Sequence, residues 1–164
     1  MNTNYAGFFV RFVAVLIDGI LIGIVQGFVI IPILAAVGFG FVSKMENMDM
    51  ADPENTVGMV GAIMAMAGTY WILAMCIQVL YFTLMESSKT QATVGKMAMG
   101  IIVTDTSGAK LDFAKAFVRN LCRLLSNLTL LIGYIIAAFT EKHQALHDII
   151  AGTLVVKKSA ATPA

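Results

Sequence analysis

Charged residues are scarce in this 164-residue sequence. They make up 13% of the chain, against about 25% in a typical soluble domain, whereas hydrophobic residues make up 59%. Residues 19–43 and 55–85 carry no charge at all, in runs of 25 and 31 residues. A helix needs about 20 apolar residues to cross a bilayer, and a soluble helix would show a polar face. The scarcity of charge therefore excludes an ordinary soluble domain and predicts transmembrane helices over residues 9–42 and 56–85.

Several signatures of chemistry are also missing. The two cysteines, Cys76 and Cys122, lack a CxxC spacing and predict neither a zinc site nor a disulfide. A net charge of +1 without a basic run gives no indication of nucleic-acid binding. Residues 95–97 lack the flanking residues of a phosphate-binding loop, and no Ser/His/Asp or Cys/His nucleophile can be assembled from motifs. We therefore expect no enzyme, no cofactor and no metal.

Charges return in residues 86–120, which predict a small element outside the membrane. Residues 100–105 have the composition of a β-strand, residues 106–108 that of a turn, and residues 109–111 that of the returning strand, so we expect a β-hairpin. Asp112 then stands at the N-cap position of a helix that begins at Phe113.

The third hydrophobic segment, residues 113–140, allows two topologies. Its uncharged stretch over 124–140 is only 17 residues long. Basic residues concentrate in 89–123 and near the C-terminus, whereas the 44–55 loop is acidic, so the positive-inside rule places both chain ends in the cytoplasm. A single crossing would put the C-terminus outside. We therefore favour two short helices, over 113–126 and 128–140, that form a re-entrant segment or a short hairpin.

The predicted fold is an all-α membrane protein with a small cytoplasmic β-hairpin. Two long transmembrane helices and the third hydrophobic segment form one domain over residues 5–157, followed by a disordered tail over residues 158–164. Small residues on the second span predict close helix packing; they are Gly58, Gly61, Ala65 and Gly68.

Asp18 is the most informative single residue, because it is an ionisable group within an apolar span. It follows Arg11 by seven residues, which places both on one helix face about 10 Å apart. A charge in such a place is costly unless it is paired or hydrated. It indicates either a proton or cation site near the cytoplasmic mouth or a structural ion pair that fixes helix packing.

Two histidines near the C-terminus give a weaker signal. His143 and His147 stand four residues apart, a metal-ligand spacing on a helix, but a zinc protease would need Glu at position 144, where the chain has Gln. We favour an amphipathic interfacial helix that ends at Gly152. A proton-handling pair of His147 and Asp148 is the alternative.

The ordered series of motifs resembles the RDD family of small bacterial membrane proteins. The matching stretches are residues 6–12, 16–19, 91–96, 100–105 and 144–156. The family is named for one arginine and two aspartates, and the resemblance assigns them to Arg11, Asp18 and Asp148. It also implies monovalent cation/proton exchange, in which Asp18 would trade a proton for a cation.

Two functions follow as alternatives. The first is a small transporter that works as a homo-oligomer, because three or four short helices leave little interior for a pathway within one chain. The second is a non-transporting accessory or assembly protein that binds partner proteins. In both cases we expect a multi-pass protein of the bacterial cytoplasmic (inner) membrane with a cytoplasmic N-terminus. Its partners would be lipid, further copies of the chain and, for the transporter, monovalent cations and protons.

Overall fold

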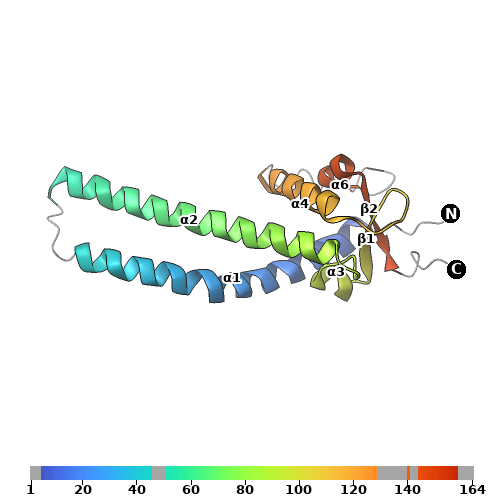
Figure 1. Cartoon of the computed structure of the whole chain (residues 1–164), viewed down its shortest axis with the longest axis horizontal. Helices are drawn as coiled ribbons and strands as arrows, with labels where there is room; N and C mark the ends of the chain where they lie inside the picture. Colours follow the sequence, from blue (N-terminus) through green and yellow to red (C-terminus); the bar gives the residue numbers. More distant parts are fainter. Residues whose placement is uncertain (1–4, 46–50, 129–139, 141–143, 159–164) are drawn as a thin grey trace. The chain divides into compact units, whose positions relative to one another are not determined.

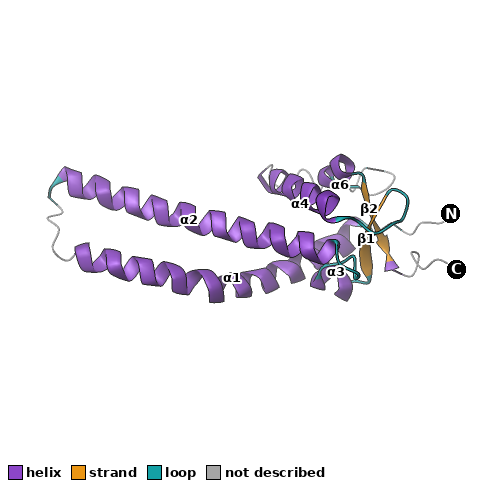
Figure 2. Ribbon diagram, in the orientation of Figure 1, coloured by secondary structure: helices purple, strands orange, loops and turns teal. Residues whose placement is uncertain are grey.

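The computed structural model describes residues 5–45, 51–128, 140 and 144–158, most of them helical (Figures 1 and 2). The elements in chain order are α1 (Phe8–Met45), α2 (Pro53–Glu86), α3 (Val94–Ala98), β1 (Ile101–Asp105), α4 (Phe113–Leu128), α6 (Leu146–Ala151) and β2 (Thr153–Lys157). The chain divides into two compact units. Unit 1 comprises residues 1–21 and 79–164, and unit 2 comprises residues 22–78.

Helices α1 and α2 are long and apolar enough to cross a membrane. Their most apolar windows are only 11% and 6% buried. The core helix of a soluble protein would instead bury such a surface, so these helices suit a lipid environment. They correspond to the predicted spans over 9–42 and 56–85 and extend a few residues beyond both. Pro32 lies inside α1, which continues through it.

Within unit 2 the two helices are joined by a side-chain hydrogen bond. The Gln26 amide nitrogen donates to the carbonyl oxygen of Ala74 at 3.0 Å. The small residues on α2 for which we predicted close helix packing make no such contact within the described part of unit 2, so their packing against another helix stays a prediction. Gly58, Gly61, Ala65 and Gly68 are all exposed, and no described atom lies within 4 Å of a Cβ built on any of the three glycines.

Two helices begin where local side chains satisfy their first backbone N–H groups. Asp52 accepts from the Glu54 backbone at 2.9 Å, and Pro53, which has no N–H to satisfy, opens α2. Asp112 accepts from the Lys115 backbone at 2.7 Å, one residue before α4. The predicted N-cap at Asp112 is thereby confirmed.

The predicted β-hairpin is wrong in its second strand. β1 forms as expected but pairs antiparallel with β2, in a register that joins Ile101 to Lys157 and Asp105 to Thr153. The segment expected to return contributes a single bridge, between Thr104 and Lys110. Both faces of the strand pair are buried, which explains the choice of partner. Ile101, Val103 and Val155 pack in one apolar cluster, and Ile102, Leu154 and Val156 pack in another.

The predicted C-terminal helix exists as α6 and ends one residue before Gly152. Gly152 has a φ of 61° and satisfies the last turn with its backbone N–H, which allows the chain to turn directly into β2. His143, residues 129–139 of the third hydrophobic segment and residues 159–164 of the predicted tail lie outside the described residues. Both cysteines are free thiols.

Gly152→Ala should destabilise unit 1 by about 1–2 kcal/mol, because a Cβ is strained in the left-handed region. The position is otherwise open, with no described atom within 4 Å of the added carbon. The midpoint of detergent-induced unfolding measures the effect. Gly7→Ala is the control, since Gly7 is equally open and lacks a positive φ. Equal midpoints for the two variants would contradict the strain argument.

Candidate functional site

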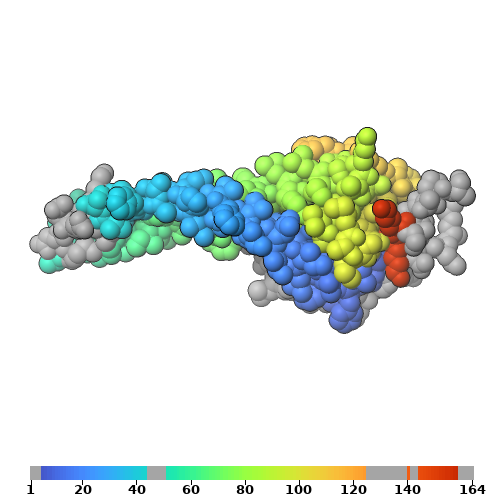
Figure 3. All heavy atoms as spheres, turned by 90° about the horizontal axis from the view of Figure 1, so that it is seen from below, coloured from blue at the N-terminus to red at the C-terminus, as the bar shows by residue number. Residues whose placement is uncertain are grey.

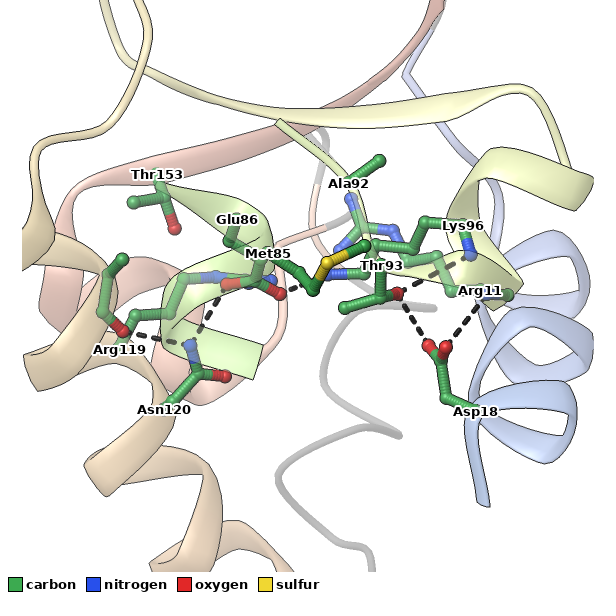
Figure 4. Close-up of polar contacts among 12 residues, drawn as sticks. Arg11, Asp18, Met85, Glu86, Ala92, Thr93, Lys96, Arg119, Asn120 and Thr153 are labelled. Carbon is green, nitrogen blue, oxygen red and sulfur yellow. Dashed lines mark hydrogen bonds and ion pairs between the residues drawn. The ribbon is translucent and has the colours of Figure 1, made fainter. Parts of the chain in front are cut away.

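Unit 1 contains a buried network of charged side chains, part of which is drawn in Figure 4. Arg11 on α1 forms one end of it. Its Nη1 donates to Asp148 Oδ2 at 2.7 Å, and its Nε donates to the carbonyl oxygen of Ala6 at 3.0 Å. A longer contact of 3.4 Å joins Nη2 to the carbonyl oxygen of Val155 on β2. One guanidinium therefore connects α1, α6 and β2.

Arg119 on α4 is the centre of the network. Its Nε and Nη2 contact Asp148 Oδ1 at 2.8 and 2.7 Å, and its Nη1 donates to Glu86 Oε2. All three side chains are at most 3% exposed. The guanidinium fork is suited to this arrangement because its five donors lie in one plane and can bind two carboxylates at once.

Glu86, the last residue of α2, is bound on both oxygens. Oε1 pairs with Lys96 Nζ of α3, and Oε2 accepts from Asn120 Nδ2 at 3.0 Å as well as from Arg119. Two buried oxygens nearby have no hydrogen-bond partner among the described residues. They are Asn120 Oδ1 and the hydroxyl of Thr83, one helical turn before Glu86.

Asp18 is buried apart from these ion pairs and is held by three uncharged donors. Oδ1 accepts from the Gly95 backbone at 2.7 Å and from the Tyr81 hydroxyl at 3.0 Å. Oδ2 accepts from the Thr93 hydroxyl at 2.5 Å. Tyr81 in turn accepts from the backbone of Val94 at 3.1 Å. Asp18 therefore fastens the start of α3 to α1, which lie side by side in Figures 1 and 3.

Gly95 makes this close approach possible. A Cβ at this position would lie 2.1 Å from the carbonyl oxygen of Ala14 and 2.9 Å from Asp18 Cγ. Any larger residue would push α3 away from α1, and the carboxylate of Asp18 would lose its backbone donor. The glycine is required by space, because its φ is not positive.

Burial shifts the protonation equilibria of the side chains around Glu86 and Asp148. Loss of hydration lowers the pKa of Lys96 to about 8, and its partner Glu86 compensates only in part. Burial alone would raise the pKa of Asp148, but Arg119 and the other neighbouring positive charges hold it well below its usual range. Lys96 is thus the base of this network that can lose its proton near neutral pH, since arginines keep their charge.

His147 is buried and uncharged at neutral pH. Loss of hydration lowers its pKa to about 3; the negative charge of Asp148 opposes this shift, whereas the positive charges of Arg119, Arg123 and Lys96 add to it. Its Nε2 lies 3.6 Å from Asp148 Oδ1. His147 and Asp148, which the sequence suggested as a proton-handling pair, are therefore adjacent, but Asp148 already forms ion pairs with Arg11 and Arg119.

The sequence singled out four residues of this region, and the structure brings three of them into the network. Arg11, His147 and Asp148 meet there, whereas Asp18 binds Tyr81, Thr93 and the backbone of Gly95 instead of Arg11. Sequence reasoning missed several partners. They are Tyr81, Glu86, Thr93, Lys96, Arg119 and Asn120. Two sequence signals could have indicated some of them: residues 91–96, which are among the stretches that resemble the RDD family and contain Thr93 and Lys96, and the spacing of Lys115, Arg119 and Arg123 every four residues on α4. Arg123 lies 3.8 Å over the ring of Phe82.

The part of the chain that the structure describes holds no group of three or more His, Cys, Asp or Glu side chains that could bind a metal. Acids and bases alternate in the network, so the carboxylate oxygens of Glu86 and Asp148 are engaged by positive charges. The arrangement suits charge compensation and proton handling better than the binding of a polyvalent metal.

Comparison with known proteins gives a family-level match. The RDD family profile matches residues 5–152. The chain is 36% identical over 153 residues to "Uncharacterized protein YxaI" of Bacillus subtilis (strain 168), covering 93% of this chain and 97% of that protein. It is 29% identical over 154 residues to "Uncharacterized membrane protein YteJ" of the same organism, covering 93% and 80%. No solved structure matches significantly.

Gly95→Ala should destabilise the folded protein by at least about 2 kcal/mol, because the added methyl overlaps the backbone of α1. Gly19→Ala is the matched control. That residue lies on the exposed side of α1 with no described atom within 4 Å of its Cβ position, so alanine should be neutral or stabilising there. Detergent-induced unfolding monitored by circular dichroism compares the two. A Gly95→Ala midpoint equal to wild type would refute the close approach of α3.

Acid should destabilise the protein through His147. Between pH 6.5 and about 3 the unfolded chain binds a proton at this residue and the folded chain does not, so stability falls as the pH falls. The slope should reach about 1.4 kcal/mol per pH unit and should be reduced by His147→Gln. Unfolding midpoints at pH 4.5–8 test this. At pH 7.5–8, where the residue is neutral in both states, the dependence on pH should be the same in variant and wild type; equal slopes at pH 4.5–6 would contradict a buried neutral His147.

Proposed function

Because the chain belongs to the RDD family of membrane proteins, we propose that it is a small transporter that exchanges a monovalent cation for a proton. The observation that carries this proposal is the buried ion pair of Lys96 and Glu86, at the end of a helix suited to cross the membrane. Ionisable groups buried in membrane proteins are costly to maintain and commonly mark ion or proton pathways.

Competition between a proton on Lys96 and a cation at Glu86 would couple the two fluxes. When Lys96 releases its proton, Glu86 Oε1 loses its positive partner while Oε2 keeps Arg119 and Asn120. A monovalent cation can then take the place of the ammonium at Oε1. When the cation leaves, Lys96 binds a proton again, so each cycle exchanges one positive charge for another and leaves the charge of the network unchanged.

The oxygens near Glu86 support this site over Asp18. Asn120 Oδ1 and Thr83 Oγ1 are buried and have no hydrogen-bond partner among the described residues, and hard cations take oxygen ligands. At Asp18 both oxygens already accept from hydroxyl or backbone donors. A cation there would have to displace those donors.

The proposal also includes the location, the oligomeric state and the lack of enzymatic activity expected of such a transporter. The protein would lie in the bacterial inner membrane with its N-terminus in the cytoplasm, would act as a homo-oligomer and would catalyse no covalent reaction. The exposed small-residue stripe on α2 supports self-association, because such residues allow membrane helices to approach closely. The stripe consists of Gly58, Gly61, Ala65 and Gly68.

A second candidate function is that of an accessory or assembly protein, and one exposed turn favours it. Residues 106–110 are all exposed, yet Asp105 Oδ1 orders them by accepting from the backbones of Ser107 and Ala109, each at 2.8 Å. An ordered exposed turn is a suitable surface for a protein partner, because little entropy is lost on binding.

Exchange is best tested with purified protein in liposomes that contain a pH-sensitive dye. A gradient of Na⁺, K⁺ or Li⁺ should drive proton movement, and the rate should rise with pH up to and beyond about 8 as Lys96 loses its proton. Glu86→Gln should abolish the flux. Lys96→Arg should also abolish it while preserving the positive charge, because arginine does not release its proton at these pH values. Lys110→Arg, at an exposed position, is the matched control.

The absence of cation-driven proton movement in folded wild-type protein would reject the exchanger. Full activity in both Glu86→Gln and Lys96→Arg would reject the Lys96–Glu86 pair as its site. Flux that survives these two changes but is lost in Asp18→Asn would instead identify Asp18 as the exchange site. An accessory protein would show no flux and would instead lose a defined partner when residues 106–110 are replaced.

A further inference from the structure

The burial of side chains on α4 is the reverse of that in a water-soluble protein. Arg119, Asn120 and Arg123 are at most 5% exposed. The opposite side of the helix is apolar and exposed. It consists of Phe113, Phe117, Val118 and Leu121, which are 39–52% exposed. The helix is therefore strongly amphipathic, with its polar side turned inward.

α6 repeats the arrangement in the same unit. His147 and Asp148 are buried, whereas the next two residues, Ile149 and Ile150, are 48% and 54% exposed. Two helices thus enclose the charge network with their polar residues and turn apolar residues away from it. We name this exposed apolar surface the α4–α6 face, and its residues are Phe113, Phe117, Val118, Leu121, Ile149 and Ile150.

We propose that the α4–α6 face lies in the lipid bilayer, against the acyl chains at the membrane interface. In water this distribution would be unfavourable twice, because apolar side chains would stay hydrated while charges lose their hydration. In lipid the first cost disappears, and the second is met by mutual pairing of the charges. The proposal concerns the placement of unit 1 and does not depend on cation exchange.

The membrane helices of the same unit support lipid as the occupant. The part of α1 within unit 1 exposes Phe9 and Leu16, and the part of α2 within unit 1 exposes Leu80 and Leu84. These residues belong to helices that suit a membrane span. Unit 1 is therefore already attached to the bilayer at two helix ends, and the α4–α6 face extends its lipid-facing character to elements outside the spans.

Length and side chains indicate an interfacial depth for α4. Its 16 residues would extend about 24 Å, less than the roughly 30 Å of hydrocarbon in a bilayer. The rings of Phe113 and Phe117 stack with centroids 6.3 Å apart, and amphipathic helices that lie at the membrane interface carry Phe and Leu on the side that faces the acyl chains. Lys115, exposed in the first turn, can extend its ammonium to the headgroups while its stem stays in apolar surroundings.

Spin labels measure this placement directly. In a background of Cys76→Ser and Cys122→Ser, single cysteines at Phe117, Leu121 and Ile150 would carry nitroxides in phosphatidylcholine–phosphatidylglycerol liposomes. Oxygen, which concentrates in lipid, should relax these labels several-fold more strongly than a water-soluble nickel chelate. Ser107 and Lys110, both exposed in the turn after β1, are the controls and should show the opposite preference.

A second measurement does not require labelling. The chain has one tryptophan, so Trp71→Phe provides a background for Phe117→Trp and Leu121→Trp, both placed on the outward side of α4 where they leave the charge network untouched. Lipids brominated on their acyl chains should quench both. The proposal is overturned if the nickel chelate is the stronger relaxant at 117, 121 and 150. It is equally overturned if neither reagent reaches these labels and bromine does not quench, because a protein surface would then cover the face.

Discussion

The arrangement of unit 1 depends on one guanidinium group bound between two carboxylates. Arg119 joins Glu86 at the end of α2 to Asp148 on α6, and all three are almost completely buried. Two carboxylates this deep in the protein would be costly without a shared positive charge, and removing one member of such a group typically costs about 3–5 kcal/mol. From this centre Lys96 extends the network to α3, and Arg11 extends it to α1 and β2.

The network explains how a small protein with an apolar exterior acquires a defined tertiary structure. In lipid, apolar side chains gain little by leaving one apolar environment for another, so packing alone specifies few contacts between helices. Paired charges are different, because each has few acceptable partners and a high cost when it has none. The order in unit 1 therefore comes from polar contacts inside, and its apolar residues serve the surface, the two small clusters around the strand pair excepted.

Features that depend on neighbouring residues could be predicted from the sequence. The two long helices follow from uncharged runs, the N-cap at Asp112 from its position before an amphipathic segment, and the turn after β1 from residues such as Gly108, whose φ is 84°. Asp18 was recognisable as a charge that needs partners. Its partners were not, because the distance along a helix that relates it to Arg11 says nothing about what α3 brings to its carboxylate.

The second strand of the predicted hairpin was also assigned wrongly because the true partner of β1 is distant in the sequence. A local turn made residues 109–111 a plausible partner for β1, but the strand has two faces to bury, and residues 154–156 supply apolar side chains for both. Glu86 and Lys96 were similarly hidden, since Glu86 looks like an ordinary charge at the end of an apolar run and Lys96 like one of several lysines in the segment outside the membrane. Only the fold shows that they face each other. Long-range pairing therefore decided the site, and periodicity carries no information about such pairing.

The separation of Arg11 and Asp148 along the chain, 137 residues, has a consequence for biosynthesis. Asp148 is synthesised 137 residues after Arg11, so the first helix emerges from the ribosome before its counter-charge exists. Throughout that interval the arginine and, later, Glu86 must remain hydrated or be shielded by the insertion machinery. The polar interior can close only after Asp148 has been synthesised, so a product truncated before that residue keeps buried-site charges that it cannot neutralise.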